Sequence, residues 1–281
     1  MAKPKWAPPT LIREPDGHAI WIQAGAHGSI QGPCESKWGY VSLSVADWDH
    51  DGQLDIMANT ISGEVWWWRN IGTRSVPQFD FARRVAVEWD GEQPELAWGW
   101  MKPRLQENPN HLLTQWRTTP VMTDFNRDGL TDLVMLDQSG VLAFFERFRR
   151  QDGTLAVRSP RRALLWHDGK PMKISCGFLN GVGCGRRKIC VCDWDGDGRL
   201  DVIVNGARNA CVYRQVDEKD GNWYFRSVGE VAVCDLATHD PQPAVCDFNA
   251  DGCPDLLFGA MDGFIYHFEN SRADQERKES E

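Results

Sequence analysis

The chain consists of short apolar segments separated by turns rich in Asp, Asn and Gly. The apolar segments are rich in β-branched and aromatic residues, which is typical of β-strands. None has the 3.6-residue spacing of apolar positions that predicts an amphipathic helix. The pattern therefore predicts an all-β protein. Its strands fall into three series, at 40–45, 119–122, 188–192 and 243–246, at 55–58, 132–136, 201–204 and 255–258, and at 63–68, 140–145, 210–213 and 263–268.

Further strands are expected between and before these series. Apolar or alternating segments at 83–88, 162–166 and 223–226 are candidates for a fourth strand in each repeating group. Two more segments near the start of the chain, at 10–13 and 18–22, also have strand character.

A nine-residue motif joins the first series of strands to the second. It reads Asp-x-Asp/Asn-x-Asp-Gly-x-x-Asp, and we number its four copies loops 1 to 4. The same polar residues at the same positions in four places indicate one structural unit repeated along the chain. The copies begin at Asp47, Asp124, Asp193 and Asp247, and successive copies are 77, 69 and 54 residues apart.

The spacing of oxygen-bearing side chains in these loops favours bound calcium, which takes six to eight oxygen ligands. Positions 1, 3, 5 and 9 offer side-chain oxygens, position 7 offers a backbone carbonyl, and glycine at position 6 allows a sharp turn. Another cation, or an Asp-Gly turn without an ion, remains an alternative. We expect about four calcium ions, with these ligands: Asp47, Asp49, Asp51, Gln53 and Asp55; Asp124, Asn126, Asp128, Leu130 and Asp132; Asp193, Asp195, Asp197, Arg199 and Asp201; Asp247, Asn249, Asp251, Cys253 and Asp255.

An EF-hand starts with the same spacing, but the sequence excludes it. The EF-hand loop needs a bidentate Glu at position 12. In this chain position 12 is apolar in every copy and lies inside a predicted strand. The four residues there are Ala58, Met135, Val204 and Phe258.

Three or four short strands per repeat, with turns between them, predict the four-stranded antiparallel blades of a β-propeller. The repeats lie near 40–90, 116–168, 186–230 and 243–270, and residues 1–39 complete the last blade or add one. We expect a single propeller domain over residues 1–270, with about five blades or as part of a larger propeller. The polar segment 271–281 is expected to be a disordered charged tail.

The loops and their flanking strands resemble the FG-GAP repeat, also described as the VCBS-type repeat, of integrin α-subunit propellers and many bacterial secreted proteins. The resemblance covers roughly residues 40–270 and includes the strand ends Arg69-Asn70 and Glu269-Asn270. It implies a β-propeller with calcium in loops between adjacent strands of a blade, held by the ligands named above. The Phe-Gly and Gly-Ala-Pro ends that name the repeat are degraded here, so the loops are better defined than the blade boundaries.

Composition narrows the classes of function. Among 281 residues, 40 Asp and Glu exceed 31 Lys and Arg, which gives a net charge of −9 without a basic stripe. A nucleic-acid partner is therefore not expected. No apolar run approaches the roughly 20 residues of a membrane helix, so membrane insertion is not expected either. Dependence on calcium favours an extracellular or periplasmic location, although the chain begins without the apolar segment of a signal peptide.

The longest spacing between loops contains an insertion, over about residues 90–115. Long loops on rigid scaffolds often carry function. Exposed Trp rings can stack on sugars, while Lys, Arg and His can meet acidic groups. We expect a binding or adhesion module for carbohydrate or protein, with the plain alternative that the Trp residues only cover a blade. The candidate ligand-binding residues are Trp98, Trp100, Lys102, Arg104, His111, Trp116 and Arg117.

The alternative function is that of a polysaccharide lyase. Rhamnogalacturonan lyases of one family are similar calcium-loop propellers, and such an enzyme needs a base such as His111 or Lys102. An arginine such as Arg104 or Arg117 would then meet the uronate. The sequence has no Gly-x-Ser-x-Gly elbow and no His-Glu-x-x-His motif, so no catalytic residue is assigned and a binding role is favoured.

Two residue types bear on packing. Alternation along a strand sends Trp66 and Trp68 to one face and Trp67 to the other, so at least one of these faces is expected in the core. The nine cysteines are an odd number. Most are expected to be small buried apolar residues, with one or two disulfides, or a zinc site, as alternatives.

Overall fold

The computed structural model describes residues 8–25, 32–91, 109–174, 186–206, 209–231, 242–260 and 263–270. These residues form β-strands and turns, and one short 3-10 turn, η1 (Gly32–Glu35), is the helical element among them. None of the described residues belongs to a helix that is long and apolar enough to cross a bilayer. The prediction of an all-β protein is confirmed.

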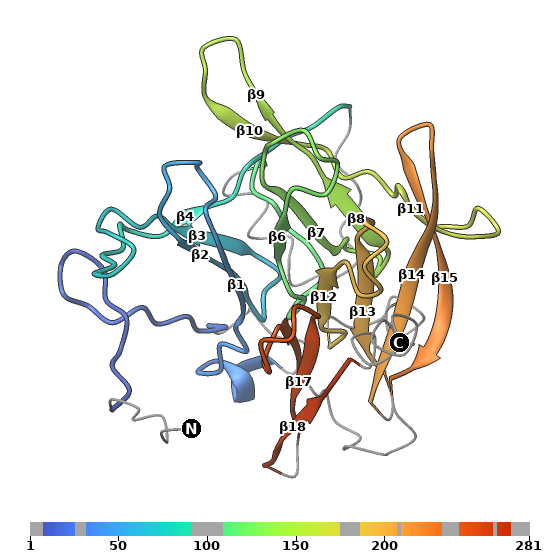
Figure 1. The fold of residues 1–281 in the computed structure, drawn as a ribbon. Helices are drawn as coiled ribbons and strands as arrows, with labels where there is room; N and C mark the ends of the chain where they lie inside the picture. Colours follow the sequence, from blue (N-terminus) through green and yellow to red (C-terminus); the bar gives the residue numbers. More distant parts are fainter. Residues whose placement is uncertain are drawn as a thin grey trace.

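Four small sheets follow one another along the chain, one for each Asp-rich loop (Figure 1). Sheet 1 contains β1 (Ser42–Ala46), β2 (Asp55–Asn59), β3 (Val65–Trp68) and β4 (Arg83–Arg84). Sheet 2 contains β6 (Val121–Thr123), β7 (Asp132–Leu136) and β8 (Leu142–Phe145). Sheet 3 is built on β12 (Ile189–Cys192), β13 (Asp201–Asn205), β14 (Ala210–Lys219) and β15 (Asn222–Glu230). Sheet 4 contains β16 (Gln242–Cys246), β17 (Asp255–Gly259) and β18 (Ile265–Phe268).

Each sheet begins in the same way. Its first two strands are antiparallel and are joined by the Asp-rich loop, and the last residue of the first strand pairs with the Asp at loop position 9. The third strand then adds to the other edge of the second. The three series of strands expected from the sequence are therefore present, in the expected order.

The expected fourth strands are present only in part. Segment 223–226 lies in β15, which pairs with β14 as the fourth strand of sheet 3, as expected. Segment 83–88 divides into β4 in sheet 1 and β5 (Val87–Glu88) in a separate sheet. There β5 pairs with β10 (Leu155–Arg158), whose other edge pairs with β9 (Arg147–Arg149). Segment 162–166 gives β11 (Leu164–Trp166), which pairs in parallel with β15 of sheet 3 instead of completing sheet 2. Sheets 1 and 3 thus each contain four antiparallel strands in succession, sheet 3 with β11 added at its edge, and a closed ring of blades is not seen among the described residues.

The expected strands at 10–13 and 18–22 also differ. Residues 8–25 contain one isolated bridge, between Arg13 and Ala19, and no strand. Backbone hydrogen bonds from Ala24 to Trp38 and from Gly25 to Ser36 hold the end of the segment. The Glu14 carboxylate also accepts hydrogen bonds from the Trp68 indole and the backbone N–H of Ala82. It therefore lies against the face of sheet 1 that carries Trp68.

Successive sheets pack face to face through their first strands (Figure 1). Strand β1 contacts β6, β6 contacts β12, and β12 contacts β16. Three apolar clusters fill the spaces between successive sheets. We call them seam 1, between sheets 1 and 2, seam 2, between sheets 2 and 3, and seam 3, between sheets 3 and 4. Burial of these clusters is the main source of stability in such an arrangement.

The middle strands show why their sequences are apolar throughout. Every residue of β7 is buried, with Leu133 and Met135 in seam 1 and Val134 and Leu136 in seam 2. A strand covered on both faces has no solvent side and so loses the alternation of polar and apolar positions. Strand β13 is buried in the same way between seams 2 and 3.

The tryptophan run of β3 alternates as expected. The rings of Trp66 and Trp68 stack on one face with their centroids 6.4 Å apart, and Trp67 packs against seam 1 on the other. Among the described cysteines no disulfide is formed. Their exposure is mixed, from the buried Cys253 to the exposed Cys246, so the expectation of burial holds only for some of them.

Candidate metal centres

The Asp side chains close each loop by hydrogen bonding to its own backbone. In loop 1 the two oxygens of Asp47 accept hydrogen bonds from the backbone N–H groups of Asp51 (3.1 Å) and Gly52 (2.9 Å). Asp51 in turn accepts one from Gln53 at 2.9 Å. Loops 2 and 4 repeat these bonds. Loop 3 differs in one of them, because Asp193 Oδ1 accepts its hydrogen bond from the backbone N–H of Gly196. The position-7 residues expected to supply a carbonyl thus hold the loop through their N–H groups.

Two positions in each loop have a left-handed backbone. Glycine occupies position 6, with φ between 84° and 88°, as expected from the motif. Position 4 is also left-handed, yet three of its four residues carry a side chain. Only loop 3 has glycine at this position, and the other three residues are His50 (φ 62°), Arg127 (φ 62°) and Ala250 (φ 61°).

The Asp at position 9 ties the loop to the third strand of its sheet. In loop 2 one oxygen of Asp132 accepts a hydrogen bond from the backbone N–H of Arg147 at 2.8 Å, and the other accepts one from Phe125 at 3.1 Å. Asp55, Asp201 and Asp255 make the equivalent pairs of bonds. All four carboxylates are buried. This burial raises the pKa of Asp132 to about 7 and that of Asp201 to about 6.

Loops 1 and 3 bring three carboxylates together. Asp47, Asp49 and Asp51 each offer one oxygen, and these oxygens lie within 4.8 Å of one another. The equivalent Asp193, Asp195 and Asp197 do the same in loop 3. Oxygen donors at this separation fit a hard divalent cation. The Oδ1 atom of Asp49 supports the fit, because it is buried and lacks a hydrogen-bond partner.

An arginine in the third strand or directly after it pairs with each of these two carboxylate groups. Arg69 forms ion pairs with Asp49 and Asp51, the latter at 2.8 Å. Arg214, at the same place in sheet 3, pairs with Asp195 and Asp197. The guanidinium groups thus supply positive charge to carboxylates that a cation would bind.

Loops 2 and 4 have Asn at position 3 and therefore carry one carboxylate fewer. The side-chain amides of Asn126 and Asn249 donate to the position-5 carboxylates, each at 2.9 Å. The third-strand position that holds arginine in sheets 1 and 3 holds Glu146 and Glu269 here. The four loops therefore divide into two pairs of different charge.

Three of the seven candidate ligand-binding residues lie in the described part of the chain. Trp98, Trp100, Lys102 and Arg104 lie outside the described residues. Trp116 and Arg117 are buried, and the Arg117 guanidinium lies 3.3 Å from the centroid of the Tyr40 ring and 3.5 Å from the Glu35 carboxylate. His111 is half-buried beside Arg84. Trp116 and Arg117 consequently have little surface to offer an external ligand.

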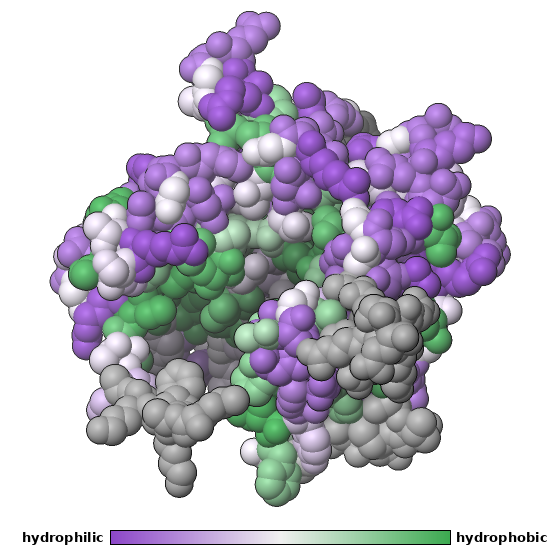
Figure 2. Space-filling model, viewed as in Figure 1, coloured by the Kyte–Doolittle hydropathy of each residue, from purple (hydrophilic) through white to green (hydrophobic). Residues whose placement is uncertain are grey.

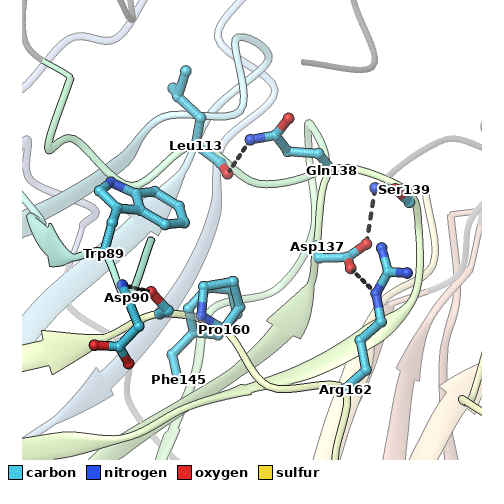
Figure 3. A pocket seen from close by; sticks show the side chains of 10 residues that line it. Trp89, Asp90, Leu113, Asp137, Gln138, Ser139, Phe145, Pro160 and Arg162 are labelled. Atoms are coloured by element: carbon cyan, nitrogen blue, oxygen red, sulfur yellow. Dashed lines mark hydrogen bonds and ion pairs between the residues drawn. The ribbon is translucent and has the colours of Figure 1, made fainter. Parts of the chain in front are cut away.

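A hollow that the sequence did not indicate lies beside the insertion (Figure 3). Trp89 stands on one side of it, with its indole N–H bound to the backbone oxygen of Pro109 at 3.2 Å. On the other side the Asp137 carboxylate pairs with the Arg162 guanidinium at 2.7 Å, and Gln138 lies next to them. An aromatic ring facing charged hydrogen-bonding groups can hold a molecule with both apolar and hydroxylated faces.

The Asp137 side chain has a structural task as well. Its Oδ1 atom accepts hydrogen bonds from the backbone N–H groups of Ser139 and Val141, which fixes the turn between β7 and β8. Its Oδ2 atom faces Arg162. The carboxylate therefore holds the half-exposed guanidinium in a defined orientation at the edge of the hollow.

One segment of the chain matches the model of a known protein family. Residues 193–258, from the start of loop 3 to strand β17 of sheet 4, match the FG-GAP-like repeat. A search of curated proteins finds no match.

Three solved structures are similar to the chain. A lectin of Agrocybe aegerita, described as recognising non-reducing terminal N-acetylglucosamine, is 19% identical over 83% of this chain and 49% of its own, with a TM-score of 0.40. The V. cholerae biofilm matrix protein Bap1 is 14% identical over 92% and 33%, with a TM-score of 0.31. The Photorhabdus luminescens Tc holotoxin pore is 10% identical over 94% and 13%, with a TM-score of 0.30.

The chain thus spans about half or less of each of these structures. The family match, by contrast, falls on the loops and strands that carry the resemblance seen in the sequence. The chain therefore contains an FG-GAP-like repeat over residues 193–258, as its Asp-rich loops predict.

Proposed function

We propose that the protein is a calcium-stabilised β-propeller that acts as a binding module, and that its ligand is a carbohydrate. The FG-GAP-like repeat and the four sheets packed through apolar seams support the propeller. The single observation that carries the ligand class is the hollow between Trp89 and the Asp137–Arg162 pair.

The four loops are the proposed calcium sites. Support comes from their oxygen-bearing side chains at positions 1, 3, 5 and 9, and from the three-carboxylate groups of loops 1 and 3. A divalent ion there would offset the repulsion between neighbouring carboxylates, roughly 1–4 kcal/mol for a pair at 4 Å. Calcium loops of low affinity bind the ion only where its concentration is high, so we also propose an extracellular or periplasmic location.

Three features of the hollow suit a sugar. The indole of Trp89 is held at its edge by a hydrogen bond, so its ring can face a ligand without losing that bond. The Arg162 guanidinium has donors beyond the one that pairs with Asp137, and these match ring hydroxyl oxygens. Along the sequence, Trp89 and Asp90 also lead directly into the insertion that carries the candidates Trp98, Trp100, Lys102 and Arg104.

The proposal is tested with a panel of glycans bound to the wild-type chain and to Trp89→Ala and Arg162→Ala. Each substitution is expected to weaken binding about tenfold or more, because stacking and charged hydrogen bonds each contribute roughly 1–3 kcal/mol. Trp21→Ala is the matched control, since Trp21 is an exposed tryptophan outside this hollow. Unchanged glycan binding in both hollow variants, or loss in the control alone, would contradict the assignment.

A further inference from the structure

A second pocket lies beside seam 1, between sheet 1 and the β9–β10 hairpin that projects from the sheets (Figure 1). Loop 1, strand β3 and residues 83–86 line one side of it, and residues of the segment 147–157 line the other. Its volume is about 510 Å³, within the roughly 300–1,000 Å³ that is typical of ligand pockets. It shares no lining residue with the hollow beside Trp89.

Positive charge is concentrated in this pocket. Among the described residues that line it, five are arginines and one, Asp49, carries a carboxylate. We call it the arginine pocket, and its arginines are Arg83, Arg84, Arg147, Arg149 and Arg150. They come from two distant segments of a chain whose net charge is −9, so the sequence itself shows no basic stripe. Figure 2 shows hydrophilic side chains over the projecting hairpin.

The five guanidinium groups differ in how far their charge is already compensated. Three of them pair with a carboxylate: Arg83 with Asp80 (2.6 Å), Arg84 with Glu64 (3.0 Å) and Arg150 with Glu88. Arg147 and Arg149 instead donate to backbone oxygens, those of Trp48 (3.1 Å) and Gly153 (2.8 Å). Neither of these two forms an ion pair with another described residue, so both retain charge that an anion could meet.

Arg147 is the buried member of the group, with 5% of its surface exposed. Its guanidinium carbon lies 3.6 Å from the centroid of the Trp48 ring, and its Nε atom has no hydrogen-bond partner. Asp49 and Asp132 attract it electrostatically, but Asp49 pairs with Arg69 and Asp132 binds backbone N–H groups. Because a buried charge without a full set of partners is costly, an anion in the pocket would stabilise this arrangement.

The exposed arginines lie on both sides of the pocket. Arg83 stands on sheet 1, with its guanidinium 5.7 Å from the centroid of the half-buried Trp67 ring, and Arg149 stands on the hairpin. A guanidinium stacked on an aromatic ring directs its N–H donors sideways, where they can form paired hydrogen bonds with an oxyanion. Trp67 and Leu155 add apolar surface next to these charges.

We propose that the arginine pocket binds the carboxylate or sulfate groups of an acidic polysaccharide. Guanidinium groups match the oxygens of such anions in geometry and charge. The apolar surface of Trp67 and Leu155 suits a sugar ring and is of no use to a lone inorganic ion. That the ligand is a carbohydrate rests on the proposed function, but the residues are different ones. A nucleic acid is disfavoured because the chain as a whole is acidic.

The test compares binding of polygalacturonate, dextran sulfate and neutral dextran to the full chain. Both acidic polymers are expected to bind at least tenfold more tightly than dextran, and less tightly as salt is raised. Arg83→Gln and Arg149→Gln remove exposed charges without emptying the core. Each is expected to weaken binding of the acidic polymers about fivefold, and the double variant roughly twentyfold. Arg226→Gln is the matched control, since Arg226 is an exposed arginine on β15 outside the pocket, and it is expected to bind like the wild type.

Two competitors identify the source of the anion. Free galacturonic acid and duplex DNA are each added to the polygalacturonate complex at equal concentrations of anionic groups, and both are expected to compete poorly. Full displacement by the free sugar acid would assign the pocket to small anions, and tighter binding of DNA would assign it to nucleic acid. Either result would overturn the proposal, as would equal binding of dextran and the acidic polymers.

The hollow beside Trp89 is separated from the arginine pocket by its own variants. If Trp89→Ala weakens binding of every glycan while Arg83→Gln and Arg149→Gln change none, the proposed function stands and the arginine pocket is refuted. If the arginine variants weaken binding of the acidic polymers while Trp89→Ala and Arg162→Ala have no effect, the hollow is refuted and the arginine pocket stands.

Discussion

At the scale of single residues, the Asp at position 9 does more than complete a loop. Asp132 is fully buried and binds two backbone N–H groups from separate segments, residue 125 of the loop and residue 147 after β8. The sequence predicts that this residue is a calcium ligand, but it cannot indicate the second task, because Arg147 is 15 residues away along the chain. Burial without a cation makes the charged carboxylate costly, which raises its pKa to about 7.

This raised pKa predicts how stability depends on pH when calcium is removed. The carboxyl of Asp132 titrates near 3.8 in the unfolded chain and near 7 in the folded one, so the folded state binds more protons between these values. The contribution of Asp132 to the free energy of unfolding is therefore greatest below about pH 4 and falls until about pH 7. Asp132→Asn is expected to reduce this slope in denaturant titrations with chelator, and an unchanged slope would contradict the assignment.

The arginines on loops 1 and 3 have a predicted effect on calcium. Arg69 pairs with two carboxylates that would bind the ion, so it competes with calcium for them. Its removal is expected to raise the affinity of loop 1 about threefold, because a half-exposed ion pair contributes roughly 0.2–1 kcal/mol. Calorimetric titration of Arg69→Ala with calcium measures this, with Arg74→Ala as the exposed control. Equal affinities in the two variants would show that the arginine does not compete.

At the scale of elements, the loop motif predicts the turn only in part. Glycine at position 6 indicates one left-handed residue, and the structure has it there in all four loops. The second left-handed residue, at position 4, could not be foreseen because three loops carry a side chain at this position. The hydrogen bonds from positions 5 and 6 to the first Asp impose this conformation on whichever residue is present.

The cost of that conformation is measurable in loop 4. Ala250 adopts this left-handed conformation, with φ 61°, although it carries a Cβ atom. Ala250→Gly is expected to stabilise the fold by about 0.5 kcal/mol, since relief of roughly 1 kcal/mol of strain exceeds the added entropy of the unfolded chain. Ala244→Gly, in strand β16, is expected to destabilise it instead. Thermal unfolding of the two variants decides this, and a lower midpoint for Ala250→Gly would contradict the strain.

The strands show where sequence patterns stop being sufficient. The first three strands of each repeat could be predicted because the loop fixes their register locally, with Ala46 opposite Asp55 in sheet 1. The outer strands depend on contacts far along the chain, and here the prediction was wrong for 162–166, which joins β15 near residue 223. Nothing in the composition of that segment distinguishes a partner in sheet 3 from one in sheet 2.

At the scale of the whole molecule, the repeat predicts how sheets pack but not which apolar positions are buried. Ile265 and Val65 occupy the same position in their repeats, yet one is exposed and the other is buried. Both are apolar, so the pattern alone assigns both to a seam. Only the arrangement of the described residues reveals which of these two positions is covered.

The candidate ligand site was missed for a related reason. The hollow is assembled from Trp89 before the insertion, Asp137 in the turn after β7, and Arg162 before β11. These residues share no motif and are separated by long stretches of chain, so only folding brings them together. Trp116 and Arg117, which the sequence suggested, are adjacent to the insertion but are directed into the core.

The central claim is that the four Asp-rich loops bind calcium ions that stabilise the fold. The most direct measurement is thermal unfolding of the chain in excess calcium and in excess chelator, with the metal content determined by elemental analysis. A free-ion concentration a hundred times the dissociation constant adds about 2.7 kcal/mol for each site, so the midpoint is expected to fall by many degrees in chelator. An identical midpoint in both conditions, with no calcium bound, would contradict the account.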